Sequence, residues 1–441
     1  FAQWRWIMVV ITQLVFYGLP WLEWGQRQAV LFDLGARRFY IFGLVLYPQD
    51  FIYLTALLVI SALSLFLFTA VAGRLWCGFA CPQTVYTEIF IWIERQFEGD
   101  RSARMRLDAS PLSFNKVWRK SGKQFAWVIF SLWTGFSFVG YFTPIRELSA
   151  SMFSLGFGPW EIFWILFYSF ATYGNAGFMR EQVCKYMCPY ARFQSAMFDK
   201  DTLIVTYDQA RGEPRGARSK KADPQALGLG SCVDCTLCVQ VCPTGIDIRK
   251  GLQYECIGCG ACVDVCDNVM DKVGYRRGLI KFSTQNAMNK GWRLAQTLRR
   301  VVRPRVLVYT AVLWVIIIGV GLSLWARNPF KVDIVRDRAT MARVVSGGKI
   351  ENVYRLQIMN AAEQTLSFQL QVDGLPGLIL ATEPLVDVGA TESHWVSVRL
   401  QLPYDAAPAG SHPIHFRIAS RLPNGELAGQ LSEKTVFLIP R

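Results

Sequence analysis

Residues 232–243 have the sequence CVDCTLCVQVCP, and residues 256–266 have the sequence CIGCGACVDVC. Both runs follow the spacing C-x2-C-x2-C-x3-C. A [4Fe-4S] cluster needs four thiolate ligands, and in two-cluster proteins the fourth Cys of each run binds the cluster of the other run. The sequence therefore predicts a ferredoxin-like module with two [4Fe-4S] clusters. The predicted ligands are Cys232, Cys235, Cys238 and Cys266 for the first cluster, and Cys256, Cys259, Cys262 and Cys242 for the second.

Structural zinc and disulfide bonds are the other uses of closely spaced cysteines. Zinc sites usually present separate C-x2-C pairs, whereas each run here has three cysteines in succession. Disulfide bonds are rare in the reducing cytoplasm, where we place this segment below. The second run departs from the usual pattern at one position, because Asp267 follows Cys266 whereas Pro243 follows Cys242. This difference removes no ligand.

The composition indicates a membrane protein. Of the 441 residues, 52% are hydrophobic and 14% aromatic, and the mean hydropathy is positive. Two segments of just over 20 residues carry no charge, which is enough to cross a hydrocarbon core of about 30 Å. Three aromatic-rich segments are weaker candidates. We therefore expect about five transmembrane helices, with the strong candidates at residues 51–72 and 306–326 and the weaker ones at 6–22, 125–143 and 160–179.

The distribution of basic residues orients these helices, because basic loops stay in the cytoplasm. Nine Lys or Arg lie in residues 74–123 and 21 in residues 180–305, whereas residues 144–159 contain one. The N-terminus and the ferredoxin-like module should therefore be cytoplasmic, and the C-terminal domain should lie outside. The weakest point is the loop 23–50, which this topology also places outside although it contains three Arg.

The net charge of +14 has the same explanation. Its basic residues are concentrated beside the predicted spans, where they set the topology and attract anionic lipid headgroups. A basic patch for nucleic acid is the alternative. We expect a lipid bilayer as partner and no nucleic acid.

The C-terminal segment changes character. From Phe330 onward, stretches such as VYRLQIMN and HPIHFRIAS alternate apolar and polar residues between Gly, Pro and Asp turns, which predicts a β-sandwich. All three histidines lie in this segment: His394, His412 and His415. A copper site at His412 and His415 is an alternative to ordinary surface histidines, but on one strand the two would point to opposite faces. Because no predicted span contains a histidine, bis-histidine haem b in the membrane is excluded.

These observations define a multi-domain membrane protein. The predicted domains are a four-helix transmembrane region (1–200), a cytoplasmic ferredoxin-like domain (201–280), a basic linker with the fifth transmembrane helix (281–329) and a β-sandwich (330–441).

Two further cysteine pairs occur in LWCGFACPQTVY (75–86) and VCKYMCPYARF (183–193), which share the pattern C-x3-C-P. If these segments are helical, each pair places its sulfurs on one helix face. Both pairs follow predicted inward-running spans, so we expect a duplicated hairpin whose pairs face each other. The members are Cys77, Cys81, Cys184 and Cys188. The alternative is that these cysteines are only small buried apolar residues.

Copper is the cation that best suits such a group. Clustered thiolates near a bilayer need a compensating cation, and soft sulfur ligands select Cu(I), with zinc as the main competitor. Met179 and Met187 are candidate thioether ligands, with ordinary packing as the alternative. Basic residues close in sequence would favour thiolates, and these are Arg74, Arg180, Lys185 and Arg192.

The chain resembles the CcoG (FixG) family of cytochrome c oxidase accessory proteins. The resemblance covers the whole chain and rests on the paired cluster motifs and four further segments. These are RQAVLFDL (27–34), RRFYIFGLVLYPQDF (37–51), GRLWCGFACPQTVYTEIF (73–90) and CKYMCPYARFQSAMFD (184–199). It implies an immunoglobulin-like fold for the C-terminal β-sandwich, which would be periplasmic, in a multi-pass protein of the bacterial inner (cytoplasmic) membrane.

The resemblance also implies reduction of Cu(II) to Cu(I) for copper delivery in cbb3-type cytochrome c oxidase assembly. Electrons would pass from an unidentified donor through the clusters to copper at the four membrane cysteines. Implied partners are copper carriers or a copper-transporting ATPase and oxidase assembly factors, with a homodimer left open. Two alternatives remain: a quinol-linked electron-transfer protein feeding a respiratory enzyme, and a copper-binding scaffold without turnover.

Overall fold

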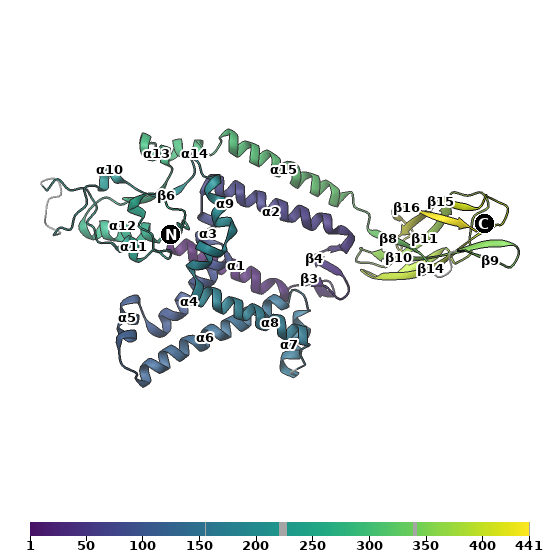
Figure 1. Cartoon of the computed structure of the whole chain (residues 1–441), viewed down its shortest axis with the longest axis horizontal. Coiled ribbons are helices and arrows are strands. Elements are labelled where there is room, and N and C mark those ends of the chain that lie inside the picture. Colours follow the sequence, from purple (N-terminus) through teal and green to yellow (C-terminus); the bar gives the residue numbers. More distant parts are fainter. Residues whose placement is uncertain (155, 220–226, 338–341, 441) are drawn as a thin grey trace. The chain divides into compact units, whose positions relative to one another are not determined.

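The computed structural model describes residues 1–154, 156–219, 227–337 and 342–440, without the side chains of Arg192, Ser195 and Leu294. The chain forms two compact units. Residues 1–32 and 52–318 make the first unit, and residues 33–51 and 319–441 make the second. Their elements are labelled in Figure 1. The first unit thus contains both the predicted four-helix region and the predicted ferredoxin-like module, whereas the segment 33–51 belongs with the C-terminal domain.

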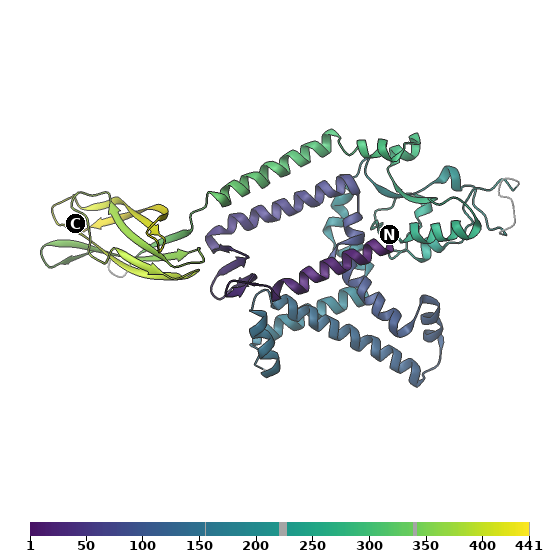
Figure 2. The same ribbon diagram turned by 180° about the vertical axis from the view of Figure 1, so that it is seen from behind.

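Helices dominate the first 200 residues. They are α1 (Ala2–Gly18), η1 (Leu19–Trp21), α2 (Phe51–Ala72), α3 (Leu75–Phe79), α4 (Pro82–Glu98), α5 (Arg101–Ala109), α6 (Phe114–Val139), α7 (Ile145–Ser154), α8 (Pro159–Thr172), the π-helices η3 (Tyr173–Met179) and η4 (Val183–Met187), and α9 (Pro189–Met197). Helices α6 and α8 pack side by side, as Figure 2 shows, and α4 packs against α6. The short strands β1 (Glu23–Trp24), β2 (Arg27–Gln28) and β3 (Val30–Asp33) follow α1.

Two helices of the described chain are long and apolar enough to cross a membrane, namely Pro48–Ala72 and Pro304–Trp325. A third would result if Ile145–Ser154 and Pro159–Met179, which are bent by 99°, formed one span. Helices also occupy the other predicted positions, but α1 has 17 residues and α6 begins with the polar segment 114–124. The five-span topology therefore stays a prediction.

The surface of α2 supports its assignment as a span. The exposed fractions of Phe51, Ile52 and Leu58 are 66%, 71% and 62%. Soluble proteins rarely leave such a continuous apolar surface uncovered. In α15 (Pro304–Trp325), Val315 is likewise 70% exposed. Contact with lipid is the simplest explanation for both helices.

The cysteine-rich segment folds around a two-stranded sheet, in which β6 (Ile204–Tyr207) pairs antiparallel with β7 (Ile280–Ser283). Between these strands lie α10 (Gln209–Gly212), α11 (Leu237–Gln240), η5 (Ile248–Lys250) and α12 (Ala261–Val273). Its core contains Ile248, Val263, Met270 and Leu279 together with several of the cysteines. The connection to α15 forms α13 (Gln285–Lys290) and α14 (Leu294–Arg299).

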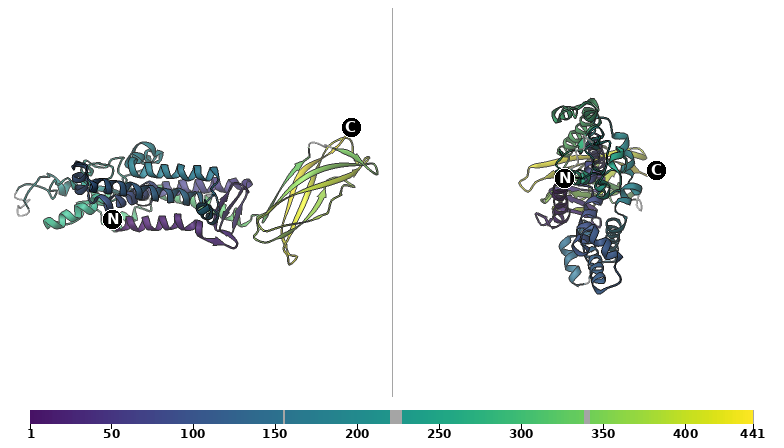
Figure 3. Two further views of the ribbon diagram at one scale, coloured as in Figure 1. Left: turned by 90° about the horizontal axis from the view of Figure 1, so that it is seen from below. Right: turned by 90° about the vertical axis from the view of Figure 1, so that its left-hand side faces the viewer.

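The second unit is a β-sandwich, whose two facing sheets are visible in Figure 3. One sheet has the order β12-β14-β10-β8 with β9 also paired to β10, and the other has the order β13-β11-β15-β16. The strands are β8 (Phe330–Arg336), β9 (Arg343–Val345), β10 (Lys349–Asn360), β11 (Leu366–Asp373), β12 (Ile379–Leu380), β13 (Leu385–Val388), β14 (Ser393–Pro403), β15 (Gly410–Arg421) and β16 (Leu427–Ile439). Ile414, Phe416 and Ile418 of β15 are buried at every second position, as the alternating pattern predicts.

The segment before α2 is attached to this sandwich. It contains β4 (Arg38–Ile41), β5 (Leu44–Leu46) and the 3-10 helix η2 (Pro48–Asp50). The hydroxyl of Tyr47 donates to the carbonyl of Asn360 at 2.8 Å, and the buried carboxylate of Asp50 pairs with Arg327 at 2.6 Å and with Lys331.

Candidate redox centres

The first cysteine-lined cavity lies beside the sheet strand β7, among Leu279, Ile280 and Met270. Its four cysteines come from the loop before α11, from α11 itself and from α12. Asp234 and Thr236 in the loop have φ values of 52° and 56°, so the chain turns tightly between the cysteines. The cysteines that line this cavity are Cys232, Cys235, Cys238 and Cys266. Cys235 is exposed, whereas the other three are buried.

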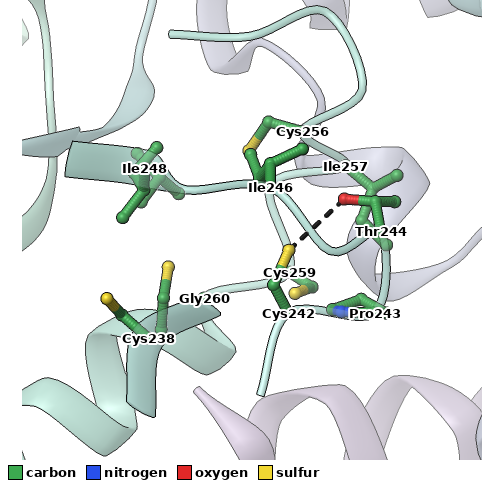
Figure 4. Close-up of a pocket in the computed structure, with 13 residues that line it drawn as sticks. Cys238, Cys242, Pro243, Thr244, Ile246, Ile248, Cys256, Ile257, Cys259 and Gly260 are labelled. Carbon is green, nitrogen blue, oxygen red and sulfur yellow. Dashed lines mark hydrogen bonds between the residues drawn. The ribbon is translucent and has the colours of Figure 1, made fainter. Parts of the chain in front are cut away.

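The second cavity is lined by residues within the segments 242–248 and 256–262. The cysteines that line it are Cys242, Cys256, Cys259, Cys262 and, from the neighbouring cavity, Cys238. Figure 4 shows Cys242, Cys256 and Cys259 among the apolar residues Ile246, Ile248 and Ile257. Gly258 and Gly260 have φ values of 67° and 73°, a conformation that a residue with a side chain rarely adopts. These glycines let the loop close around the cavity.

Both cavities fit a [4Fe-4S] cluster. Each collects one of the two predicted sets of four, and all twelve cysteines of the chain are free thiols. Burial raises the pKa of Cys256 to about 11 and that of Cys266 to about 12, so thiolates at these positions require a cationic centre such as an iron–sulfur core.

A single zinc ion fits less well. Zn–S bonds of about 2.3 Å would bring the sulfurs within about 4 Å of one another. Within the described part of the chain, no group of three or more His, Cys, Asp or Glu is arranged to hold one metal ion.

The two C-x3-C-P motifs have matching backbones. Cys77 lies in α3 and Cys184 in η4, whereas Cys81 and Cys188 are the extended N-cap residues of α4 and α9. The N–H of Cys81 donates to Trp76 O at 3.0 Å, and that of Cys188 donates to Val183 O at 2.8 Å. In each motif the next residue is a Pro at the first helical position. The condition for placing both sulfurs on one helix face is therefore not met, because a residue before Pro avoids the helical conformation.

The thiols of the two motifs lie near one another. Burial raises the pKa of Cys184 to about 12, and the neighbouring thiols of Cys81, Cys77 and Cys188 contribute to the same direction. Burial also raises the pKa of Cys77 to about 11. The four cysteines thus form one group of thiols across the two motifs, although no three of them are arranged to share one metal ion.

Arg74 lies near the thiols of Cys77 and Cys184, where its positive charge acts to lower their pKa against the larger effect of burial. Its guanidinium also donates to the backbone carbonyls of Tyr254 and Ala191. Arg180 likewise donates to Glu94 and to the carbonyl of Gly177. Arg74 therefore connects two backbone segments by hydrogen bonds. The sequence alone does not indicate this role, because all its hydrogen-bond partners are main-chain atoms.

The first motif contacts the loop of the second cavity directly. Cys77 and Cys184 pack against Ile257, Cys259 and Ala261. A Cβ atom on Gly78 would lie 2.7 Å from Cys259 Cα and 2.8 Å from Cys259 N, so the two backbones touch. The cluster loop and the four thiols are therefore immediate neighbours within the first unit.

A buried group of charges supports the helices that carry the motifs, and sequence reasoning did not single it out. Lys123 of α6 pairs with Glu98 at 2.8 Å and with Glu94 at 3.5 Å, both on α4. Arg180, which precedes the second motif, pairs with Glu94 at 3.2 Å. Removing one partner of such a buried pair costs about 3–5 kcal/mol. The network fixes α4, which begins directly after Cys81, relative to the segment that leads to Cys184.

The histidines of the β-sandwich form no site in the described structure. His412 and His415 lie on β15 with opposite orientations, His415 being exposed, and the ring Nε2 of His412 lies 2.7 Å from Pro408 O. His394 lies on β14 in the other sheet. This arrangement agrees with ordinary surface histidines.

Three protein families match the chain. The family described as "4Fe-4S dicluster domain" matches residues 179–285, and "4Fe-4S binding domain" matches residues 54–98. The "IG-like fold at C-terminal of FixG" matches residues 320–440. The last match confirms the predicted immunoglobulin-like β-sandwich.

Relatives extend over most of the chain. Nitrogen fixation protein FixG of Rhizobium meliloti is 39% identical over 407 residues, which cover 85% of this chain and 78% of that protein. Protein RdxA of Cereibacter sphaeroides is 39% identical over 423 residues, which cover 93% of this chain and 87% of that protein. The crystal structure of a FixG-related protein from Vibrio parahaemolyticus covers 25% of this chain and 97% of its own, with 19% identity and a TM-score of 0.22.

The 4Fe-4S domains and the two cysteine-lined cavities define the class of protein as an iron–sulfur oxidoreductase. The identity to both curated relatives over most of their length shows the family. The chain belongs to the FixG family, as the sequence motifs predict.

Proposed function

We propose that this protein reduces Cu(II) to Cu(I) at Cys77, Cys81, Cys184 and Cys188. The observation that carries the proposal is the contact between the loop of the second cavity and the two thiols Cys77 and Cys184. A soft thiol group beside a one-electron centre suits a metal whose reduced form prefers sulfur.

The chain's residues have separate tasks in this reaction. Cys232, Cys235, Cys238 and Cys266 would hold one [4Fe-4S] cluster, and Cys242, Cys256, Cys259 and Cys262 the other. When bound, the clusters supply one-electron chemistry, so each Cu(II) that becomes Cu(I) takes one electron that a donor protein or reductant must replace. The four thiols bind the substrate copper, which has to draw them together and displace their protons.

Copper reduced in this way would serve the assembly of a cbb3-type cytochrome c oxidase. The proposal rests on the family resemblance, which also implies copper carriers or a copper-transporting ATPase as partners on the copper side. The ferredoxin-like module would face the cytoplasm and the β-sandwich the periplasm. A homodimer remains compatible with this arrangement.

A double substitution tests the role of the thiols. In Cys77→Ser with Cys184→Ser, we expect loss of Cu(I) binding and of Cu(II) reduction, with the iron content unchanged because the cluster cysteines are separate. Cluster reoxidation is followed by stopped flow, as the recovery of visible absorbance after dithionite-reduced protein is mixed with Cu(II). Free Cu(II) also oxidises exposed clusters, so only a rate that is fast in the wild type and slow in the variant supports the proposal. Equal reoxidation rates in the wild type and the double variant would show that these cysteines are only buried packing residues.

A quinol-linked electron-transfer protein is the second candidate. It is favoured by the match of the "4Fe-4S binding domain" to residues 54–98, which contain only Cys77 and Cys81 as cysteines. Those two thiols would then help to hold or tune a further redox centre. In this case quinol should reduce the purified protein and copper should cause no turnover. A pure scaffold would instead bind copper without reoxidation of its clusters.

A further inference from the structure

The point at which an electron leaves the clusters can be located from backbone contacts. A Cβ atom on Gly78 would lie 2.7 Å from Cys259 Cα, 2.8 Å from Cys259 N and 2.9 Å from Gly258 C. Cβ atoms essentially never lie below 3.0 Å from such atoms, and main-chain atoms cannot rotate away. Gly78 is therefore the residue that allows the first motif to touch the cluster loop.

The cluster loop also leaves little room where Gly258 approaches the backbone of Arg74. Gly258 has a φ of 67°, and a Cβ atom there would lie 3.2 Å from the carbonyl carbon and oxygen of Arg74. The Arg74 side chain reaches over the same loop to the carbonyl of Tyr254, and it also donates to Ala191 of α9. One residue thus holds together the first motif, the cluster loop and the helix that follows Cys188.

The two motifs differ at the position that makes this contact. The residues between the cysteines are Gly78, Phe79 and Ala80 in the first motif, all of them buried. In the second motif the corresponding residues are Lys185, Tyr186 and Met187, of which Tyr186 is 70% exposed. The glycine thus occurs in the motif that faces the cluster loop and is replaced by a long side chain in the other.

We propose that the second cavity is the electron exit and that Gly78 is a positioning residue that sets the distance between its cluster and the four thiols. This inference rests on the proposed function and specifies its route. Electron transfer slows steeply with distance, and a small displacement of reacting centres can cost a large factor in rate. Cys77 and Cys184 receive the electron because they pack against the group formed by Ile257, Cys259 and Ala261.

Gly78→Ala tests the route. We expect an unchanged iron and sulfide content, unchanged Cu(I) binding by the four thiols, and reoxidation of reduced clusters by Cu(II) slowed roughly tenfold or more. Gly174→Ala is the matched control, since a Cβ atom on Gly174 meets nothing within 4 Å and this glycine lies outside both motifs, ten residues before Cys184. Equal reoxidation rates in the two variants would overturn the proposal.

A distance measurement that needs no turnover separates this inference from the proposed function. Co(II) bound at the four thiols is paramagnetic and does not oxidise the clusters, and Zn(II) is its diamagnetic control. Co(II) should speed the spin relaxation of one reduced cluster, the one whose signal is lost in Cys242→Ser, and the effect should weaken in Gly78→Ala. Relaxation of the other cluster instead, or absence of Co(II) binding in the wild type, would overturn the inference.

The outcomes remain distinct if copper is not the substrate. Enhanced relaxation without copper-dependent reoxidation in the wild type would refute the proposed function and leave the exit route intact. Arg74→Lys serves as a second variant if Gly78→Ala lowers the iron content. Lysine keeps the positive charge but lacks the planar guanidinium that donates to two carbonyls. Arg74→Lys should therefore also slow the reoxidation of the reduced clusters by Cu(II).

Discussion

Asp50 and Arg327 lie 277 positions apart in the sequence, yet they form an ion pair with an N···O distance of 2.6 Å. Asp50 also pairs with Lys331 and accepts the backbone N–H of Tyr47 at 3.0 Å. Asp50 immediately precedes α2, and Arg327 follows the end of α15 by two residues. If α2 and α15 cross a membrane, their ends beside this pair must therefore lie on the same side.

This relationship leads to a prediction for the loop 23–50, whose three Arg make it the weakest part of the topology. A reporter that is active only in the periplasm should be active when inserted after the exposed Ala36 and when fused after Arg441. The same reporter inserted after Lys250 should be inactive, because the basic segments beside it favour the cytoplasm. Opposite activities at the first two positions would contradict the ion pair, and activity only after Lys250 would invert the orientation.

Asp50→Asn should destabilise the second unit. The carboxylate is 3% exposed and compensates two cations, so its neutralisation leaves Arg327 and Lys331 without their partner at a cost of about 3 kcal/mol. Protease resistance of the C-terminal domain across a urea series, measured in the full chain, reports this change.

Asp373→Asn is the control for that measurement. Asp373 pairs with Arg417 at 2.6 Å, but both side chains are about half exposed, so the loss should stay below about 1 kcal/mol. Equal effects of the two substitutions would show that the buried pair contributes no more than a surface pair.

The crosswise pairing of the cluster cysteines predicts which substitutions behave alike. Purified anaerobic protein should contain about eight iron and eight sulfide per chain, from two cubes of four. Cys266→Ser and Cys235→Ser should lose the same EPR signal, because both residues line the first cavity. Cys242→Ser and Cys259→Ser should lose the other signal. If Cys266→Ser matched Cys259→Ser instead, each run would hold its own cluster and the assignment would be wrong.

Local sequence patterns predict the parts of this structure that depend on neighbours in the chain. The C-x2-C-x2-C-x3-C spacing places the first three cysteines of a run around one cavity and the fourth, four residues after the third, at the other cavity, so the two cavities collect the predicted sets. Alternation of apolar residues predicts β15 for the same reason. The positions of Pro82 and Pro189 also indicate that Cys81 and Cys188 are extended cap residues, because a residue before Pro avoids the helical conformation.

Contacts between distant segments are the part that the sequence does not reveal. The approach of Gly78 to Cys259 depends on how two backbones meet, and neither residue has a neighbour in sequence that indicates the other. Arg74 lies near the thiol of Cys77, as its position in the sequence predicts, but its hydrogen bonds go to carbonyls of residues more than a hundred positions away. Such partners have no side-chain signature, so only the folded structure identifies them.

The difference between the two motifs predicts a role for Met187. This residue is 56% exposed between Cys184 and Cys188, whereas Phe79 and Ala80 in the first motif are buried. The second motif is therefore the more exposed of the two between its cysteines. Under the proposed function, copper would enter and leave on this side. A thioether there would give Cu(I) an additional soft ligand.

Met187→Leu should weaken Cu(I) binding by about tenfold, a loss comparable with that of a supporting residue at a metal site. Leucine keeps the volume but has no sulfur, so folding and iron content should not change. Competition with a Cu(I) chelator under anaerobic conditions measures the affinity. Met105→Leu is the control, because Met105 is 62% exposed on α5 and belongs to neither motif. The same affinity in both variants would show that Met187 is a surface residue without a part in copper binding.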